Sequence, residues 1–148
     1  MRTLVLAEKP SVGRDIARVL GAKAGGEGYL ENERWVVSWA IGHLVELCDP
    51  EELDPAWKKW RMDSLPMLPD ELKTKVSSRT RRQFSVVKKL LLDPGVGDVV
   101  CATDSGREGE LIFRYIYHLS GCKKAVRRLW ISSMTDEAIR EGFGNLRP

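Results

Sequence analysis

The sequence has little of what builds a disulfide scaffold, a zinc site or a membrane span. Its 148 residues contain only three cysteines and two histidines, and no two cysteines are spaced as C-x-x-C. We therefore expect neither a disulfide framework nor a zinc site, and we expect a reducing cytoplasmic setting. No run of 18 apolar residues occurs, so a membrane-spanning helix is not expected. The opening residues MRTLVLAEKPS are too short an apolar stretch for a signal peptide.

Charge is distributed unevenly along the chain. The formal net charge is +3, but three segments are rich in Lys and Arg and contain no Asp or Glu: residues 56–61, 73–89 and 123–130. A segregated basic field of this kind permits nucleic-acid binding without requiring it. The alternative is that these segments form solvated helix faces and loop rims.

Hydrophobic periodicity predicts alternating strands and helices. Short apolar runs predict buried strands at residues 3–7, 34–40, 98–103 and 127–132. Helical spacing of apolar residues predicts helices at residues 12–21, 80–92, 107–121 and 135–146. This order predicts an α/β fold with a mostly parallel central sheet and helices on both faces.

Two regions between these elements are expected to be irregular. Residues 24–33 are rich in glycine and predict a turn, while residues 46–72 hold four of the seven prolines. The proline-rich region predicts a long excursion with short helices and little regular sheet. In the helix at residues 107–121, the residues expected to face inward are Leu111, Ile112, Tyr115, Ile116 and Leu119.

Acidic residues follow two of the predicted strands. Glu8 comes directly after the first strand, and Asp104 comes after the apolar run VVCAT. The carboxyl ends of parallel strands form the crevice where such folds bind ligands, so neighbouring strands would bring these two carboxylates together. Glu108 lies in the first turn of the next helix and could face the same spot, whereas Glu110 is expected to point elsewhere.

Carboxylate oxygens at one edge of a sheet suit Mg²⁺ better than zinc or copper. Carboxylates this close repel one another and are hard to keep ionised without a cation. The alternative is structural: Glu8 pairs with Lys9 or Arg107, and Glu108 complements the start of a helix. Gly106 and Gly109 allow a tight turn, but the chain contains neither a P-loop motif nor G-x-G-x-x-G.

Four ordered motifs carry a family resemblance. They are LAEKPS (Leu6–Ser11), SWAIGHL (Ser38–Leu44), ATDSGREGELI (Ala102–Ile112) and LWISSMTDEAI (Leu129–Ile139). Together they resemble the Toprim domain of bacterial type IA DNA topoisomerases, most closely topoisomerase III. The resemblance spans nearly the whole chain and implies a Rossmann-like Toprim fold.

The resemblance also implies a role for each matching position. Glu8 corresponds to a metal-linked glutamate at the cleavage site, and Asp104 and Glu108 correspond to acids of the D-x-D-x-E motif that binds Mg²⁺. Lys9 and Arg107 correspond to cations near the scissile phosphate, a task that suits charge-assisted hydrogen bonds.

One position departs from the family pattern. Where the motif has its second aspartate, this chain has Gly106. A carboxylate ligand is therefore missing, which favours a single Mg²⁺ held by Glu8, Asp104 and Glu108 over a two-metal site.

Type IA enzymes cut DNA through a phosphotyrosyl bond, and their tyrosine belongs to another domain. Tyr29, Tyr115 and Tyr117 match no such position and are interpreted as structural. Residues 1–148 are therefore expected to be an N-terminal fragment without the tyrosine-bearing domain. The remaining domains of the same polypeptide are its expected partners.

The resemblance implies further contacts. Trp60 and Arg61 lie in an exposed-looking loop and are candidates for binding single-stranded DNA by stacking and phosphate contact. The alternative is that Trp57 and Trp60 anchor this loop on the core. His43 is a candidate for supporting the site by contact with its ligands, without binding the ion itself. Topoisomerase III relatives often work beside helicases, so a helicase is an implied partner at the nucleoid.

Two other functions remain open at this point. A primase or a Toprim nuclease also uses a Glu and a D-x-D acid set, but lacks the context of AIGHL and LWISSMTDEAI. With Gly106 in place of Asp, the domain could also be a binding module for DNA or protein that works without metal.

Overall fold

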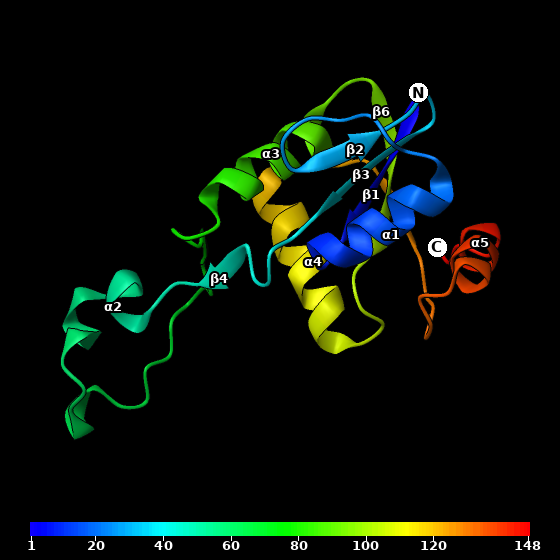
Figure 1. The fold of residues 1–148 in the computed structure, drawn as a ribbon. Coiled ribbons are helices and arrows are strands. Elements are labelled where there is room, and N and C mark those ends of the chain that lie inside the picture. The colour runs from blue at the N-terminus through cyan, green and yellow to red at the C-terminus, as the bar shows by residue number, and fades with distance from the viewer.

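The computed structural model describes residues 1–148, and its order of elements confirms the predicted α/β alternation (Figure 1). The strands are β1 (Arg2–Ala7), β2 (Tyr29–Glu31), β3 (Trp35–Trp39), β4 (Val45–Leu47), β5 (Thr74–Val76), β6 (Val96–Ala102) and β7 (Ala125–Arg128). The helices are α1 (Pro10–Leu20), α2 (Pro50–Leu53), α3 (Arg81–Leu92), α4 (Arg107–Ser120) and α5 (Asp136–Gly144), with 3-10 turns η1 (Pro55–Lys58) and η2 (Met62–Ser64). None of these helices has the length and apolar character that crossing a membrane requires.

The main sheet has five strands in the order β2-β3-β1-β6-β7. The pairs β3–β1, β1–β6 and β6–β7 are parallel, and only β2 runs antiparallel at the edge. The prediction of a mostly parallel sheet is therefore confirmed. The prediction of a turn throughout residues 24–33 is wrong, because Tyr29–Glu31 pairs with β3 as an edge strand. Pairing with a neighbouring strand overrides the local preference of a glycine-rich segment.

Alternation along the strands divides the core into two layers. Leu4 and Leu6 of β1 face a hydrophobic cluster that includes residues of α3 and α4. Val5 and Ala7, one residue out of phase, face a second cluster that includes residues of α1 and α5. Figure 1 shows the two helix pairs on opposite faces of the sheet, as predicted.

The inward face of α4 differs from the one expected. Leu111 is 44% exposed, whereas Phe113 is completely buried beside Ile112 and Ile116. Tyr115 and Leu119 pack against the cluster only from its margin. The helix starts at Arg107, and positions 109, 112, 113, 116 and 120 make up its buried stripe. Tertiary contact with the sheet selects this stripe over the neighbouring apolar one.

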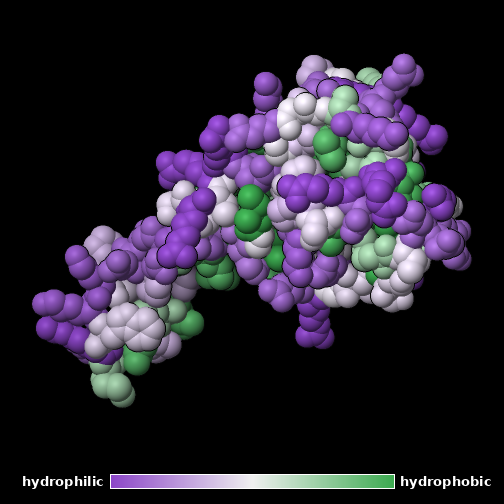
Figure 2. All heavy atoms as spheres, viewed as in Figure 1, coloured by the Kyte–Doolittle hydropathy of each residue, from purple (hydrophilic) through white to green (hydrophobic).

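The excursion between β4 and β5 forms an arm, which we define as residues 48–73. It projects away from the sheet, and β4 and β5 pair with each other at its base (Figure 1). The arm contains only α2, η1 and η2 as regular structure, in agreement with the prediction. Green hydrophobic side chains reach its surface near the tip in Figure 2. The exposed large apolar residues of the arm are Trp60, Met62, Leu65, Leu68 and Leu72.

Candidate active site at the carboxyl ends of the strands

Two neighbouring parallel strands bring Glu8 and Asp104 together. The ends of β1 and β6 are in register, since Ala7 pairs with Ala102. Glu8 follows Ala7 directly, and Asp104 follows Ala102 by two residues. Glu8 is only 7% exposed, while Asp104 is open to solvent. The structure thus brings together a buried and an accessible carboxyl group at the carboxyl ends of two adjacent strands.

The surroundings of this pair disfavour the charged form of Glu8. Burial raises the pKa of the Glu8 carboxyl, and the adjacent Asp104 raises it further through hydrogen bonding and charge repulsion. The nearby Lys9 ammonium lowers the pKa of Glu8, but not enough to cancel these effects. No basic side chain forms an ion pair with Glu8 or Asp104, so the proposed pairing of Glu8 with Lys9 or Arg107 is not formed. A buried carboxyl beside another carboxylate is the environment that an added cation stabilises.

Glu108 lies elsewhere. It occupies the first turn of α4, its side chain is 78% exposed, and its Oε1 lies 3.2 Å from Nε2 of His43. His43 belongs to the loop between β3 and β4, so this contact joins two of the recognised motifs. No group of three Asp, Glu, His or Cys side chains is arranged to hold a metal ion. The expected convergence of Glu108 with Glu8 and Asp104 is therefore not seen in this structure.

Oxygen donors are nevertheless the right type for Mg²⁺. Glu8 and Asp104 supply carboxylate oxygens, and the magnesium ion ordinarily keeps several water ligands in addition to one or two carboxylates. The pair therefore fits this ion in donor chemistry. His43 contacts Glu108 and neither member of the pair, so its supporting role at the site stays a prediction.

Two cations without ion pairs lie close in sequence to the carboxylates. Lys9 is exposed at the N-terminal end of α1, and Arg107 is exposed as the first residue of α4. Neither forms an ion pair in this structure. Free cations at the starts of two helices are suited to binding an anion such as phosphate, because helix N-termini also favour negative charge.

Gly106 and Gly109 differ in how much space the surrounding protein leaves for a side chain. A Cβ atom on Gly109 would lie 2.1 Å from the carbonyl oxygen of Asp104, so only glycine lets α4 start this close to the loop. A Cβ atom on Gly106 would meet nothing within 4 Å, and the backbone there is extended (φ 165°). The missing aspartate at position 106 is therefore not a consequence of crowding.

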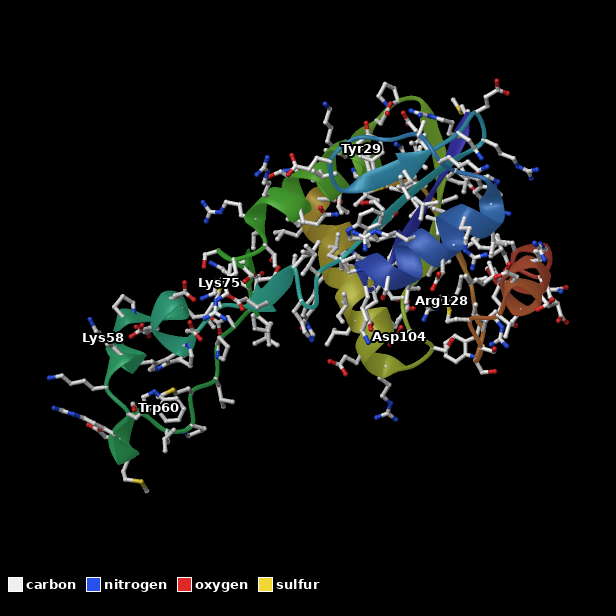
Figure 3. All side chains as sticks on the ribbon, viewed as in Figure 1. Tyr29, Lys58, Trp60, Lys75, Asp104 and Arg128 are labelled. Carbon is white, nitrogen blue, oxygen red and sulfur yellow. The ribbon has the colours of Figure 1, made fainter.

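Arg128 is the residue of this region that sequence reasoning missed. The predicted strand at residues 127–132 is displaced, since β7 ends at Arg128, and this arginine is 8% exposed. Its guanidinium donates hydrogen bonds to the carbonyl oxygens of Thr103 and Asp104, directly after β6. Figure 3 labels both Arg128 and Asp104. Consecutive side chains in a strand point to opposite faces of the sheet. The pair Arg127–Arg128 in a predicted strand was therefore the signal that one arginine faces the protein interior.

Trp60 and Arg61 lie far from the carboxylates along the chain and in space. Figure 3 shows Trp60 on the arm and Asp104 beside the sheet. Trp60 is 78% exposed and Arg61 is also exposed, whereas Trp57 is half-buried. Trp60 therefore does not anchor the loop on the core, and that alternative is wrong for this residue.

None of the three tyrosines belongs to the carboxylate site. Tyr29, Tyr115 and Tyr117 are partly buried and pack against the cluster under α3 and α4. The hydroxyl of Tyr117 donates a hydrogen bond to the carbonyl of Lys124, and burial raises the pKa of this phenol. Both observations agree with a structural interpretation.

Comparison with known protein families supports the resemblance. The family model described as "Toprim domain" matches residues 3–134. The chain is 52% identical over 147 residues to DNA topoisomerase 3 of Bacillus thuringiensis and 50% identical to that of Staphylococcus epidermidis. In both cases the alignment covers 99% of this chain, which spans about a fifth of the relatives' length.

The fold has a counterpart among solved structures. Full-length topoisomerase I from Thermotoga maritima aligns with a TM-score of 0.60 and 21% sequence identity. The alignment covers 97% of this chain and 21% of that protein. At this identity the likeness supports the α/β Toprim architecture and nothing finer.

Proposed function

This chain belongs to the Toprim domain family, and on that premise we propose that it forms the acidic half of the active site of a type IA DNA topoisomerase of the topoisomerase III type. The observation that carries the proposal is the meeting of Glu8 and Asp104 at the ends of β1 and β6. Relatives with this name are about five times longer, and we propose that the complete reaction likewise needs a longer polypeptide. Its other domains are the proposed partners of this one and the proposed source of the nucleophilic tyrosine.

Glu8 and Asp104 are the proposed ligands of one Mg²⁺ ion. Glu108 is the third candidate and has to leave His43 to join them. The ion, when bound, supplies positive charge that stabilises the scissile phosphate in the transition state. Lys9 and Arg107 are the proposed contacts of the oxygens of this phosphate, and both would orient it for in-line attack.

The arm is the proposed site of contact with single-stranded DNA outside the active centre. Trp60 offers an exposed ring for base stacking, and Arg61 offers a cation for the adjacent phosphate. We propose a cytoplasmic location at the nucleoid, and a helicase as a partner, by extension from topoisomerase III relatives.

Calorimetry with Mg²⁺ tests the proposed site directly. We expect binding by the parent chain and at least about tenfold weaker binding by Asp104→Asn and Glu8→Gln, since each removes a ligand. Asp63→Asn on the arm is a matched control that should bind as the parent does. Binding that survives in Asp104→Asn would contradict the proposed ligands. Binding of single-stranded oligonucleotides that ignores Mg²⁺ and Asp104→Asn would support the metal-independent module instead.

A further inference from the structure

Arg128 occupies a fixed position at the end of β7. On one side its strand pairs with β6, where Cys101 is its partner in register. On the other side its backbone exchanges two hydrogen bonds with Arg147, at 2.7 and 2.9 Å. The side chain is 8% exposed, so a positive charge is enclosed by protein. A buried guanidinium is costly unless its donors and its charge are satisfied.

The donors of Arg128 converge on the segment that leads from β6 to Asp104. Nη1 donates to the carbonyl oxygen of Thr103 at 2.8 Å, to its hydroxyl at 3.0 Å and to the carbonyl oxygen of Cys101 at 3.2 Å. Nη2 donates to the carbonyl oxygen of Asp104 at 2.7 Å. One side chain thus binds three carbonyl groups within four consecutive residues.

The charge of Arg128 is balanced from α4. Its Nε lies 3.5 Å from Oε2 of Glu110 and has no hydrogen-bond partner of its own. The other carboxylate oxygen of Glu110 accepts a hydrogen bond from Arg114 at 2.7 Å. The ring of Trp130 lies 5.4 Å from the guanidinium carbon and covers it. Arg128 therefore ties the end of β6 to both β7 and the first turns of α4.

We propose that Arg128 is a positioning residue that holds the Asp104 loop where its carboxylate meets Glu8. This inference rests on the proposed function, since it assigns a role at the same site. The hydrogen bonds act on the carbonyl groups of Cys101 and Thr103, which precede Asp104, and on the carbonyl group of Asp104 itself, so they set the direction in which the loop leaves the strand. The planar fork of arginine reaches several acceptors at once, whereas the single ammonium of lysine cannot replace this geometry.

Arg128→Lys is the informative variant, because it keeps the positive charge opposite Glu110. We expect it to fold, to bind Mg²⁺ about 10–100-fold more weakly than the parent chain, and to exchange the amide hydrogens of residues 103–109 faster. Arg127→Lys is the matched control. Arg127 is the neighbouring arginine, it is exposed, and it pairs with Asp98 away from the loop. This control should change neither quantity.

A purely stabilising role for Arg128 predicts a different result. Val87→Ala removes two methyl groups from α3 in the core cluster beneath it, and so lowers Tm without removing any hydrogen bond to the loop. If Arg128 only stabilises the fold, then Arg128→Lys and Val87→Ala will behave alike, with lower Tm, unchanged Mg²⁺ affinity and exchange raised throughout the chain. That outcome would overturn the inference.

Asp104→Asn separates this inference from the proposed function. Loss of Mg²⁺ binding in Asp104→Asn together with parent-like binding and loop exchange in Arg128→Lys would overturn the role of Arg128 alone. Parent-like Mg²⁺ binding in Asp104→Asn would overturn the proposed ligands instead. Amide exchange at residues 103–109 needs no metal, so unchanged exchange in Arg128→Lys overturns the positioning role even where no Mg²⁺ binding is detected.

Discussion

The strand ends and the arm hold their side chains in different ways. At the strand ends, Glu8 is 7% exposed and the loop of Asp104 is bonded to a buried arginine. On the arm, Trp60 is 78% exposed and is held only by short turns on either side. The first arrangement suits chemistry, which needs fixed distances between reacting groups. The second suits contact with a flexible polymer, which needs accessible rings and charges.

The largest effect is expected from removing one aromatic ring from the body, which we define as the five-stranded sheet with α1, α3, α4 and α5. Phe113→Ala leaves a cavity beneath α4, because this side chain is completely buried. We expect the free energy of unfolding to fall by about 3–5 kcal/mol. Urea denaturation followed by circular dichroism measures this loss. A loss below about 1 kcal/mol would mean that α4 repacks freely and that the body is not the rigid part.

The next largest effect is expected at the loop itself. Gly109→Ala places a methyl group against the carbonyl oxygen of Asp104, so backbone has to shift. We expect a loss of stability of about 1–3 kcal/mol together with weaker Mg²⁺ binding. Gly106→Ala is the matched control and should stay within about 0.5 kcal/mol, since the space there is open. Thermal melting and Mg²⁺ titration of both variants check the contrast, and equal effects at the two glycines would contradict it.

On the arm, removal of a ring should affect binding and not stability. Trp60→Ala should change the free energy of unfolding by no more than about 0.5 kcal/mol. Its affinity for a single-stranded oligonucleotide should fall by about 1–3 kcal/mol if the ring stacks on a base. Fluorescence anisotropy with a labelled oligonucleotide measures the affinity. Leu68→Ala, equally exposed on the arm, should leave it unchanged, so equal losses in both variants would argue against stacking.

The smallest expected effect concerns pH at the rim of the body. Arg18 of α1 binds Asp136 of α5 through two hydrogen bonds of 2.9 Å and lowers the pKa of that carboxyl below its ordinary 3.8. A lowered pKa in the folded state adds stability above pH 3.8, and this stability is lost as the pH falls through the folded value. Urea curves at pH 7 and pH 3 should therefore differ less for Asp136→Asn than for the parent chain. Equal differences would mean that the pair contributes nothing.

Much of this molecule could be predicted from its residues. Apolar runs of β-branched residues identified β1, β3 and β6, and the rule that ligands bind at the carboxyl ends of parallel strands identified Glu8 and Asp104 as neighbours. The fold class and the Toprim resemblance were confirmed. These inferences succeeded because they depend on local periodicity and on the order of elements.

Other features depend on contacts between distant segments, and only the tertiary structure decided them. The strand Tyr29–Glu31 exists because β3 offers it a partner, and Phe113 is buried because of how α4 lies on the sheet. Glu108 meets His43 across 65 residues of sequence, and Arg128 reaches Asp104 across 24. Residue order determined which carboxylates end the central strands. The packing of β7 and α4 against those strand ends determined which side chains support them, because burial and hydrogen-bond partners are properties of the assembled fold.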